Sequence, residues 1–147
     1  MSEASRKESN PKDVFGARKV PFSLLSGRVL AYMAVGMGEG GMKYGGFNWR
    51  HAHVLSSVYY DATLRHLLAW HEGQDIDPDS GLHHVVKAMT SLHVLMDAIL
   101  IGKWIDDRPI RGGDLDFMSV CNGLVGTLLM KYPNPVARYT HIPLPPR

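Results

Sequence analysis

Cysteine is nearly absent from this sequence, which carries one thiol, Cys121, among 147 residues. A single cysteine excludes an internal disulfide and favours a reducing compartment, so we expect a cytoplasmic protein. No hydrophobic run approaches the roughly 20 residues that a membrane helix needs, and we expect no membrane partner. The segment 1–19 also lacks the apolar core of a signal peptide.

An excess of charge of one sign is lacking as well. Sixteen Lys and Arg residues against 14 Asp and Glu residues give a net charge of +2. This balance does not require a basic face, so nucleic acid is not an expected partner. Hydrophobic residues make up 45% and charged residues 20%, as in ordinary globular proteins.

Apolar residues recur at helical spacing, and no segment shows the alternation of a half-buried strand. We expect helices over about 24–37, 52–72, 82–103 and 115–131. Ser23 and Asp114 would begin the first and fourth helices, glycines from 36 onward would end the first, and Gly73 would end the second. The prediction is an all-α fold, a compact bundle of about four helices. A bundle this small often completes its core with a copy of itself, so a homo-oligomer is expected.

The domain organisation follows from composition. We expect a flexible leader over 1–20, a single helical domain over 21–132 and an extended, proline-rich tail over 133–147. Within the third helix, one stripe of bulky residues is predicted to be buried. Its members are Val85, Met89, Leu92, Met96 and Ile99. A neighbouring stripe of mostly small residues would let another helix or a ligand come close. It consists of His84, Ala88, Ser91, Leu95, Ala98 and Gly102.

An acidic loop follows the second predicted helix. Glu72, Asp75, Asp77 and Asp79 lie within eight residues. Clustered carboxylates repel one another unless a cation neutralises them, and Mg²⁺ prefers oxygen ligands, which makes the loop a candidate site for Mg²⁺ or Mn²⁺. The alternative is a solvated turn in which Asp79 or Ser80 caps the next helix. A calcium-binding hand is excluded by its missing Gly and Glu positions.

His84 lies just after this loop, in the first turn of the third helix. A histidine there can be a satisfied structural residue, or it can serve as a ligand or in proton transfer. The neighbouring acidic residues favour the second role.

The segment 43–50 combines cations with aromatic rings. Lys43 and Arg50 could hold phosphate, while Tyr44 and Trp49 could stack on a base, as nucleotide recognition requires. In the alternative, the two rings anchor this segment to the core. The nearby glycines form neither a Walker loop nor a dinucleotide fingerprint.

Three sequence patterns resemble a known family. They are Lys43-Tyr44-Gly45 with Asn48-Trp49-Arg50, the run from Arg65-His66 through Trp70, Gly73, Asp75, Asp77 and Ser80-Gly81 to His84, and Asp106-Asp107-Arg108-Pro109. Together they resemble the phage and prophage proteins named for a dATP/dGTP diphosphohydrolase N-terminal domain, which are relatives of the MazG-like all-α nucleotide pyrophosphohydrolases. The resemblance covers about residues 24–110.

This resemblance implies a mainly helical, metal-dependent enzyme that uses Mg²⁺ or Mn²⁺. It would hydrolyse purine deoxynucleoside triphosphates to the monophosphate and pyrophosphate. Carried onto this sequence, the catalytic candidates are Glu72, Asp77 and His84, and the metal candidates are Glu72, Asp75 and Asp77. The substrate-binding candidates are Lys43, Tyr44, Asn48, Trp49, Arg50, Arg65, His66 and Arg108.

One departure from the MazG-like pattern leaves the activity open. Those enzymes carry Glu-Glu-x-x-Glu on one helix and Glu-x-x-Asp on the next, and neither string occurs here. Either the loop acids hold the metal, or the protein is a non-catalytic phage protein that binds and sequesters a nucleotide-derived signalling molecule. A third alternative is an interaction module whose polar stripe is a subunit interface.

Overall fold

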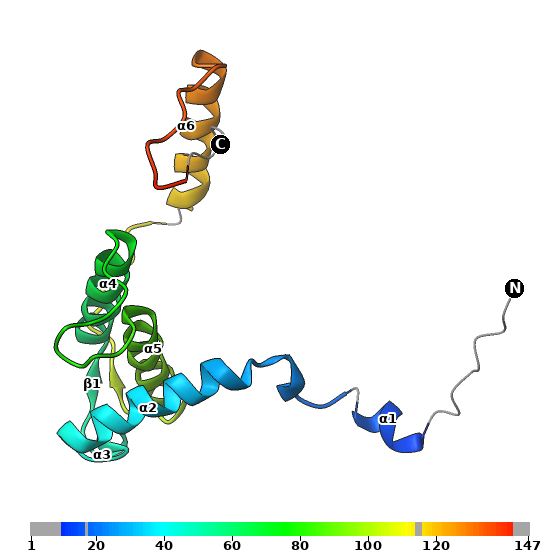
Figure 1. Ribbon diagram of the computed structural model, residues 1–147, viewed down its shortest axis with the longest axis vertical. Coiled ribbons are helices and arrows are strands. Elements are labelled where there is room, and N and C mark those ends of the chain that lie inside the picture. Colours follow the sequence, from blue (N-terminus) through cyan, green and yellow to red (C-terminus); the bar gives the residue numbers. More distant parts are fainter. Residues whose placement is uncertain (1–9, 17, 114–115, 143–147) are drawn as a thin grey trace, which may run out of the picture. The chain divides into compact units, whose positions relative to one another are not determined.

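The computed structural model describes residues 10–16, 18–113 and 116–142 (Figure 1). These residues are mainly helical, which confirms the predicted all-α class. The helices are α1 (Pro11–Gly16), α2 (Gly27–Tyr44), α3 (Asn48–His51), α4 (Ser56–His71), α5 (His84–Leu100) and α6 (Phe117–Lys131), with a 3-10 turn at Phe22–Leu24. Two short parallel strands, β1 (Val54–Leu55) and β2 (Trp104–Ile105), were not predicted. No helix of the described residues is long and apolar enough to cross a membrane.

The chain divides into two compact units, 1–108 and 109–147. The first contains α1 to α5 and the strand pair, and the second contains α6. This division lies inside the predicted 21–132 domain, whose limits remain a prediction. The predicted leader includes the six-residue helix α1.

Helix α2 runs through the glycines that were expected to end it near residue 37, so that prediction is wrong. Gly36 is buried against α5, where a Cβ would lie 2.8 Å from Thr90 Cγ2. The close approach of the two helices offsets the helix-breaking tendency of glycine. The helix begins one turn later than expected, where the Ser26 side chain, not Ser23, accepts from the Val29 amide at 3.5 Å.

Helices α4 and α5 pack side by side, and α2 crosses α5 (Figure 1). The residues that α5 buries include His84, Ala88 and Ala98 from the small stripe, and Ala98 is fully buried. Four of the five bulky residues predicted to be buried, Val85, Leu92, Met96 and Ile99, are instead exposed, and Met89 is partly so. The small side chains permit the close helix contact, which turns the bulky stripe outward.

A small hydrophobic cluster joins α3, the strands and α5. Trp49, Val54 and Ala98 are buried together, and Trp104 packs against them. Val54 pairs with Trp104 in the parallel ladder. Asp107, the second residue after β2, accepts hydrogen bonds from the amide and hydroxyl of Ser57 in the first turn of α4.

The loop before α5 does not cap that helix as predicted. His83 is the first flanking residue and makes no side-chain cap, while the Asp75 carbonyl accepts from the His84 amide at 3.0 Å. Gly73 does end α4 with a φ of 95°, as expected. Asp114 lies outside the described residues, and Asp116 caps α6 by accepting from the Ser119 amide.

Candidate functional site

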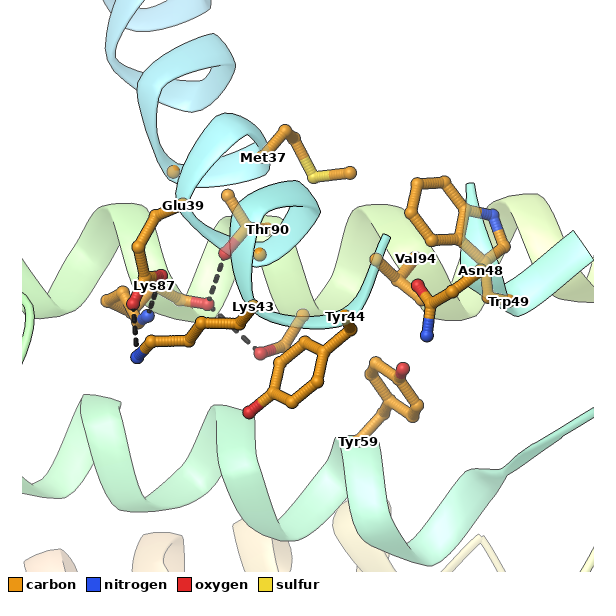
Figure 2. Close-up of a pocket in the computed structure, with 13 residues that line it drawn as sticks. Met37, Glu39, Lys43, Tyr44, Asn48, Trp49, Tyr59, Lys87, Thr90 and Val94 are labelled. Carbon is orange, nitrogen blue, oxygen red and sulfur yellow. Dashed lines mark hydrogen bonds and ion pairs between the residues drawn. The ribbon is translucent and has the colours of Figure 1, made fainter. Parts of the chain in front are cut away.

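A pocket of about 150 Å³ opens between α2, α3, α4 and α5 (Figure 2). Helix α2 supplies one wall, to which Gly36 and Gly40 contribute backbone without a side chain. Four of the predicted substrate-binding residues line it. They are Lys43, Tyr44, Asn48 and Trp49. The sequence prediction therefore placed half of its eight substrate-binding candidates around one cavity.

Two lysines and one carboxylate form the polar wall of the pocket. Glu39 lies 2.5 Å from both the Lys43 ammonium and the Lys87 ammonium. Burial acts to raise the pKa of Glu39, but the hydrogen bonds from the two lysines outweigh it and lower the pKa. Lys87 is as buried as Glu39, with 17% of each side chain exposed, whereas 42% of Lys43 is exposed. Lys43 is therefore the cation that a ligand can reach.

Lys43 also joins the pocket to the acidic loop. Its ammonium donates to Asp79 Oδ2 at 3.3 Å, and the Asp79 side chain is 83% exposed. The hydrogen bonds that Lys43 donates to Glu39 and Asp79 raise its pKa, so the ammonium stays charged at neutral pH. An exposed carboxylate at such a position can be displaced by a phosphate, because a phosphate offers the same charge with more acceptor oxygens.

The aromatic wall holds Tyr44 and Tyr59, whose side chains lie near each other (Figure 2). Tyr59 is partly buried, and burial raises the pKa of its hydroxyl, with a smaller contribution from Tyr44. Tyr44 is 71% exposed and its ring is available for stacking. Trp49 is only 6% exposed and belongs to the core cluster, so it mainly anchors this wall.

Arg50 is held away from the pocket by Asp97. The Asp97 carboxylate accepts from Arg50 Nε at 2.9 Å and Nη2 at 3.1 Å, and from Trp49 Nε1 at 2.6 Å. These donors, Arg50 first, lower the pKa of Asp97. The bidentate pair fastens α3 to α5, and the predicted phosphate role of Arg50 would require breaking it.

His66 and His84 meet across the α4–α5 contact, with their Nδ1 atoms 2.8 Å apart. His84 is buried, and its Nε2 lies 3.1 Å from Gln74 Oε1. Burial is the largest cause lowering the pKa of His66, which favours the neutral ring at pH 7. The sequence assigned these two histidines to different roles, and the structure brings them into one cluster.

The histidine pair lies on the same helix faces as the pocket. Tyr59 and His66 are seven residues apart on α4, and Ser91 and His84 are seven apart on α5. Seven residues are about two helical turns, or about 10.5 Å along the axis. Tyr59 and Ser91 both line the pocket. A ligand with its head in the pocket can therefore extend along these faces toward the histidines.

The acidic loop is a tight turn, closed by a bridge between Ile76 and His83. Asp77 shapes it by accepting from the Ser80 hydroxyl at 2.6 Å and from the Ser80 amide at 3.2 Å. Burial acts to raise the pKa of Asp77, but the Ser80 hydrogen bond and the loop amides outweigh it and lower the pKa. Asp77 thus has a structural role in the turn, and a catalytic role would have to use the same carboxylate.

The predicted metal ligands Glu72, Asp75 and Asp77 do not gather around one point. The Glu72 side chain is 85% exposed, Asp75 is exposed, and Asp77 is committed to the turn. Across the described ranges of the chain, no three His, Cys, Asp or Glu residues are placed to hold a metal ion. The residues therefore do not fit a metal ion held by the protein alone.

Arg65 and Arg108, the other two arginines among the predicted substrate-binding residues, lie outside the pocket. Arg65 is exposed on α4 beside His66 and forms no ion pair within the described part of the chain. Arg108 is held by Asp106 at 2.6 and 2.8 Å and stacks over the Trp104 ring. Arg65 is thus the better placed of the two to meet a phosphate near the histidine pair.

Sequence reasoning missed Glu39, Lys87, Tyr59 and Gln74. The four-residue spacing of Glu39 and Lys43 was a usable signal, because such pairs face each other on a helix. The predicted end of α2 near residue 37 leaves both residues outside the helix, so the sequence prediction does not contain the pair. Lys87 and Gln74 carried no comparable signal, since their partners come from other elements.

Comparison with known proteins supports the family suggested by the sequence. The family described as "dATP/dGTP diphosphohydrolase, N-terminal" matches residues 9–108. A protein of Salmonella phage PMBT28 named "dATP/dGTP diphosphohydrolase" is 33% identical over 94 residues, which are 64% of this chain and 32% of the phage protein. The match thus spans about a third of that relative. No solved structure matches the chain.

The matched residues 9–108 contain the pocket, the histidine pair and the acidic loop. They also coincide closely with the first compact unit, 1–108. This chain belongs to the family of dATP/dGTP diphosphohydrolase N-terminal domains.

Proposed function

We propose that this chain binds a purine deoxynucleoside triphosphate and hydrolyses it to the monophosphate and pyrophosphate. The pocket carries the proposal, because Lys43, Tyr44, Asn48 and Trp49 line it together. All four are also residues that the sequence predicts to bind substrate. The name of the phage relative points to the same class of substrate.

In this proposal the phosphates are held by Lys43, whose ammonium exchanges Asp79 for a phosphate oxygen. Glu39 and Lys87 form a partly buried ion pair that positions Lys43. The exposed ring of Tyr44 stacks on the base. A pocket of about 150 Å³ is smaller than the roughly 300–1,000 Å³ typical of ligand sites, so it encloses only part of a nucleotide.

The rest of the triphosphate would lie along α4 and α5 toward Arg65 and the histidine pair. There, a neutral imidazole can accept a proton from the attacking water. Because Glu72, Asp75 and Asp77 do not converge, dependence on Mg²⁺ or Mn²⁺ stays a prediction. We assign no step of the reaction to a metal.

Sequestration of a nucleotide-derived signalling molecule without hydrolysis is the second candidate. Two observations favour it. The described residues place no three metal ligands together, and the phage relative that carries the activity name is matched over only 32% of its length. Hydrolysis and sequestration would use the same pocket and Lys43, so only a measurement of turnover distinguishes the two functions.

We also propose that the protein is a homo-oligomer. The bulky stripe of α5 is exposed, with 49% of Leu92 and 52% of Met96 accessible. A helix normally buries such a stripe, and a second copy of the chain would cover it. Oligomerisation would also protect the apolar residues exposed along α2, among them Tyr32 and Val35.

The test is to incubate the purified protein with ribo- and deoxyribonucleoside triphosphates, with and without Mg²⁺ or Mn²⁺. Chromatography would follow both product formation and ligand retained on the protein. We expect monophosphate and pyrophosphate from purine deoxynucleotides, and both weaker binding and slower turnover in Lys43→Gln. Retention without product supports sequestration, and neither retention nor product contradicts both functions.

A further inference from the structure

A chain of hydrogen bonds connects Gln74, His84 and His66. Gln74 Oε1 lies 3.1 Å from His84 Nε2, and His84 Nδ1 lies 2.8 Å from His66 Nδ1. His84 is buried, with 4% of its surface exposed, whereas His66 is only partly buried. The chain therefore runs from the loop, through a buried ring, to a ring that water can reach.

Proton counting assigns a donor and an acceptor at each contact. An amide oxygen only accepts, so His84 Nε2 carries the proton that Gln74 Oε1 receives. A neutral His84 then has a bare Nδ1, which must accept from His66 Nδ1. A neutral His66 with its proton on Nδ1 has a bare Nε2. The free lone pair of the cluster is therefore on His66 and not on His84.

We propose that His66 Nε2 is the base that removes a proton from the attacking water, and that His84 and Gln74 are positioning residues that set its tautomer. This inference rests on the proposed hydrolysis. It reverses the roles predicted from sequence, in which His84 was catalytic and His66 bound substrate. The Asp–His arrangement of many hydrolases uses the same logic, in which a neighbouring acceptor fixes the proton on one ring nitrogen.

The charges around His66 suit this role. The groups that act on it are Asp77 in the loop, Arg65 on its own helix, and His84 and Lys87 on α5. Asp77 would stabilise the imidazolium that forms during the reaction, while burial and the cations favour the neutral ring beforehand. Arg65 lies next to His66 in sequence and could hold the phosphate that is attacked.

The reaction balances with water as the only co-reactant. The water oxygen bonds to the α-phosphorus as His66 Nε2 takes one proton. The bond between the α-phosphorus and the bridging oxygen breaks, and pyrophosphate leaves with that oxygen. The proton on His66 then passes to pyrophosphate or to solvent, which restores the neutral ring.

The tautomers can be measured without any activity, by long-range ¹⁵N–¹H NMR of the histidine rings in the full chain. We expect His66 to be protonated on Nδ1 and bare on Nε2, and His84 to be protonated on Nε2. The outcome that overturns the inference is a proton on His66 Nε2. Gln74→Leu removes the acceptor, so His66 should then populate both tautomers. Gln74→Glu keeps an acceptor oxygen, so His66 should stay protonated on Nδ1.

Kinetics separate the catalytic role from a structural one. His66→Gln should lower kcat by about 100-fold or more, the range of general-base catalysis, while the Kd for the nucleotide changes little. His71→Gln is the matched control, since His71 lies at the end of the same helix with 80% of its side chain exposed. In Gln74→Glu, the added charge stabilises the imidazolium, so the acid limb of the kcat/KM profile should move to higher pH.

The outcomes distinguish this inference from the function on which it rests. If the wild-type protein turns over and His66→Gln is equally fast, the base assignment is wrong and the hydrolase function stands. If the wild-type protein binds nucleotides without turnover in any metal condition, the hydrolase function is wrong and the catalytic role falls with it.

Discussion

Gly36 on α2 and Thr90 on α5 are packed so closely that a Cβ built at Gly36 would lie 2.8 Å from Thr90 Cγ2 and 3.1 Å from Val86 Cγ1. Thr90 is buried, branched at Cβ and hydrogen-bonded through its hydroxyl to the Lys87 carbonyl at 2.9 Å. Its side chain therefore cannot easily adopt another rotamer. The contact sets the distance between α2 and α5, and Gly36 itself lines the pocket.

Gly36→Ala should therefore destabilise the protein. Overpacking costs about 1–3 kcal/mol, which exceeds the gain of about 1 kcal/mol from helix propensity. The net expectation is a fall in the free energy of unfolding of up to about 2 kcal/mol in chemical denaturation. Gly38→Ala is the control on the same helix, because nothing lies within 4 Å of its Cβ. It should gain stability, and a gain in both variants would contradict the packing argument.

Much of the helical architecture could be predicted from sequence, but the inward faces could not. Helical periodicity located α4, α5 and α6 to within a few residues. It also marked two adjacent stripes on α5, and only tertiary packing decides which of them faces α4. The small stripe is buried because Ala88 and Ala98 let the helices approach, which leaves Leu92 and Met96 exposed.

The site was predictable where its residues are close in sequence. Lys43, Tyr44, Asn48 and Trp49 come from one short segment, and they do line one pocket. Lys87 joins them only because α2 crosses α5, and Gln74 meets His84 only because the acidic loop folds back on itself. A local sequence pattern carries no information about such long-range contacts.

Lys43→Gln should weaken nucleotide binding. Hydrogen bonds to charged groups contribute about 1.5–3 kcal/mol, so we expect Kd to rise by about 10- to 100-fold in isothermal titration calorimetry. Arg28→Gln removes an exposed cation from the same helix, far from the pocket, and serves as the control. An equal loss of nucleotide affinity in the two variants would indicate a general effect of net charge and would argue against a phosphate contact at Lys43.

The folded protein should lose stability as the pH falls below about 6.5, the ordinary pKa of histidine from which His66 is lowered. The unfolded chain then binds a proton that native His66 resists, so the stability present above pH 6.5 is lost as the pH falls through the lower native pKa. The carboxylates of Asp77 and Asp97 act in a separate window, below their ordinary pKa of 3.8.

Urea unfolding between pH 7.5 and 5 measures this effect. His66→Gln should flatten the pH dependence relative to the wild-type protein, because the variant has no ring to protonate at this position. His71→Gln, which replaces a largely exposed histidine at the end of the same helix, is the matched control. An unchanged slope in His66→Gln would mean that other groups carry the pH dependence.

The exposed stripe of α5 should mediate self-association. Light scattering of the wild-type protein should give a multiple of the chain mass of 16.3 kDa. Leu92→Glu with Met96→Glu should reduce the mass to that of a single chain, because two carboxylates cannot be buried in an apolar interface without partners. Both side chains are about half exposed in the single chain, so the folded protomer should survive, as circular dichroism can verify.

Met42→Glu is the matched control for this pair, since Met42 is 84% exposed on α2 and lies outside the stripe. It should leave the mass of the oligomer unchanged. A wild-type mass of 16.3 kDa would refute self-association. An oligomer that survives the double substitution would show that another apolar surface, such as the exposed N-terminal half of α2, joins the subunits. Nucleotide binding measured on the dissociated variant would then decide whether the pocket functions within one chain or depends on the assembly.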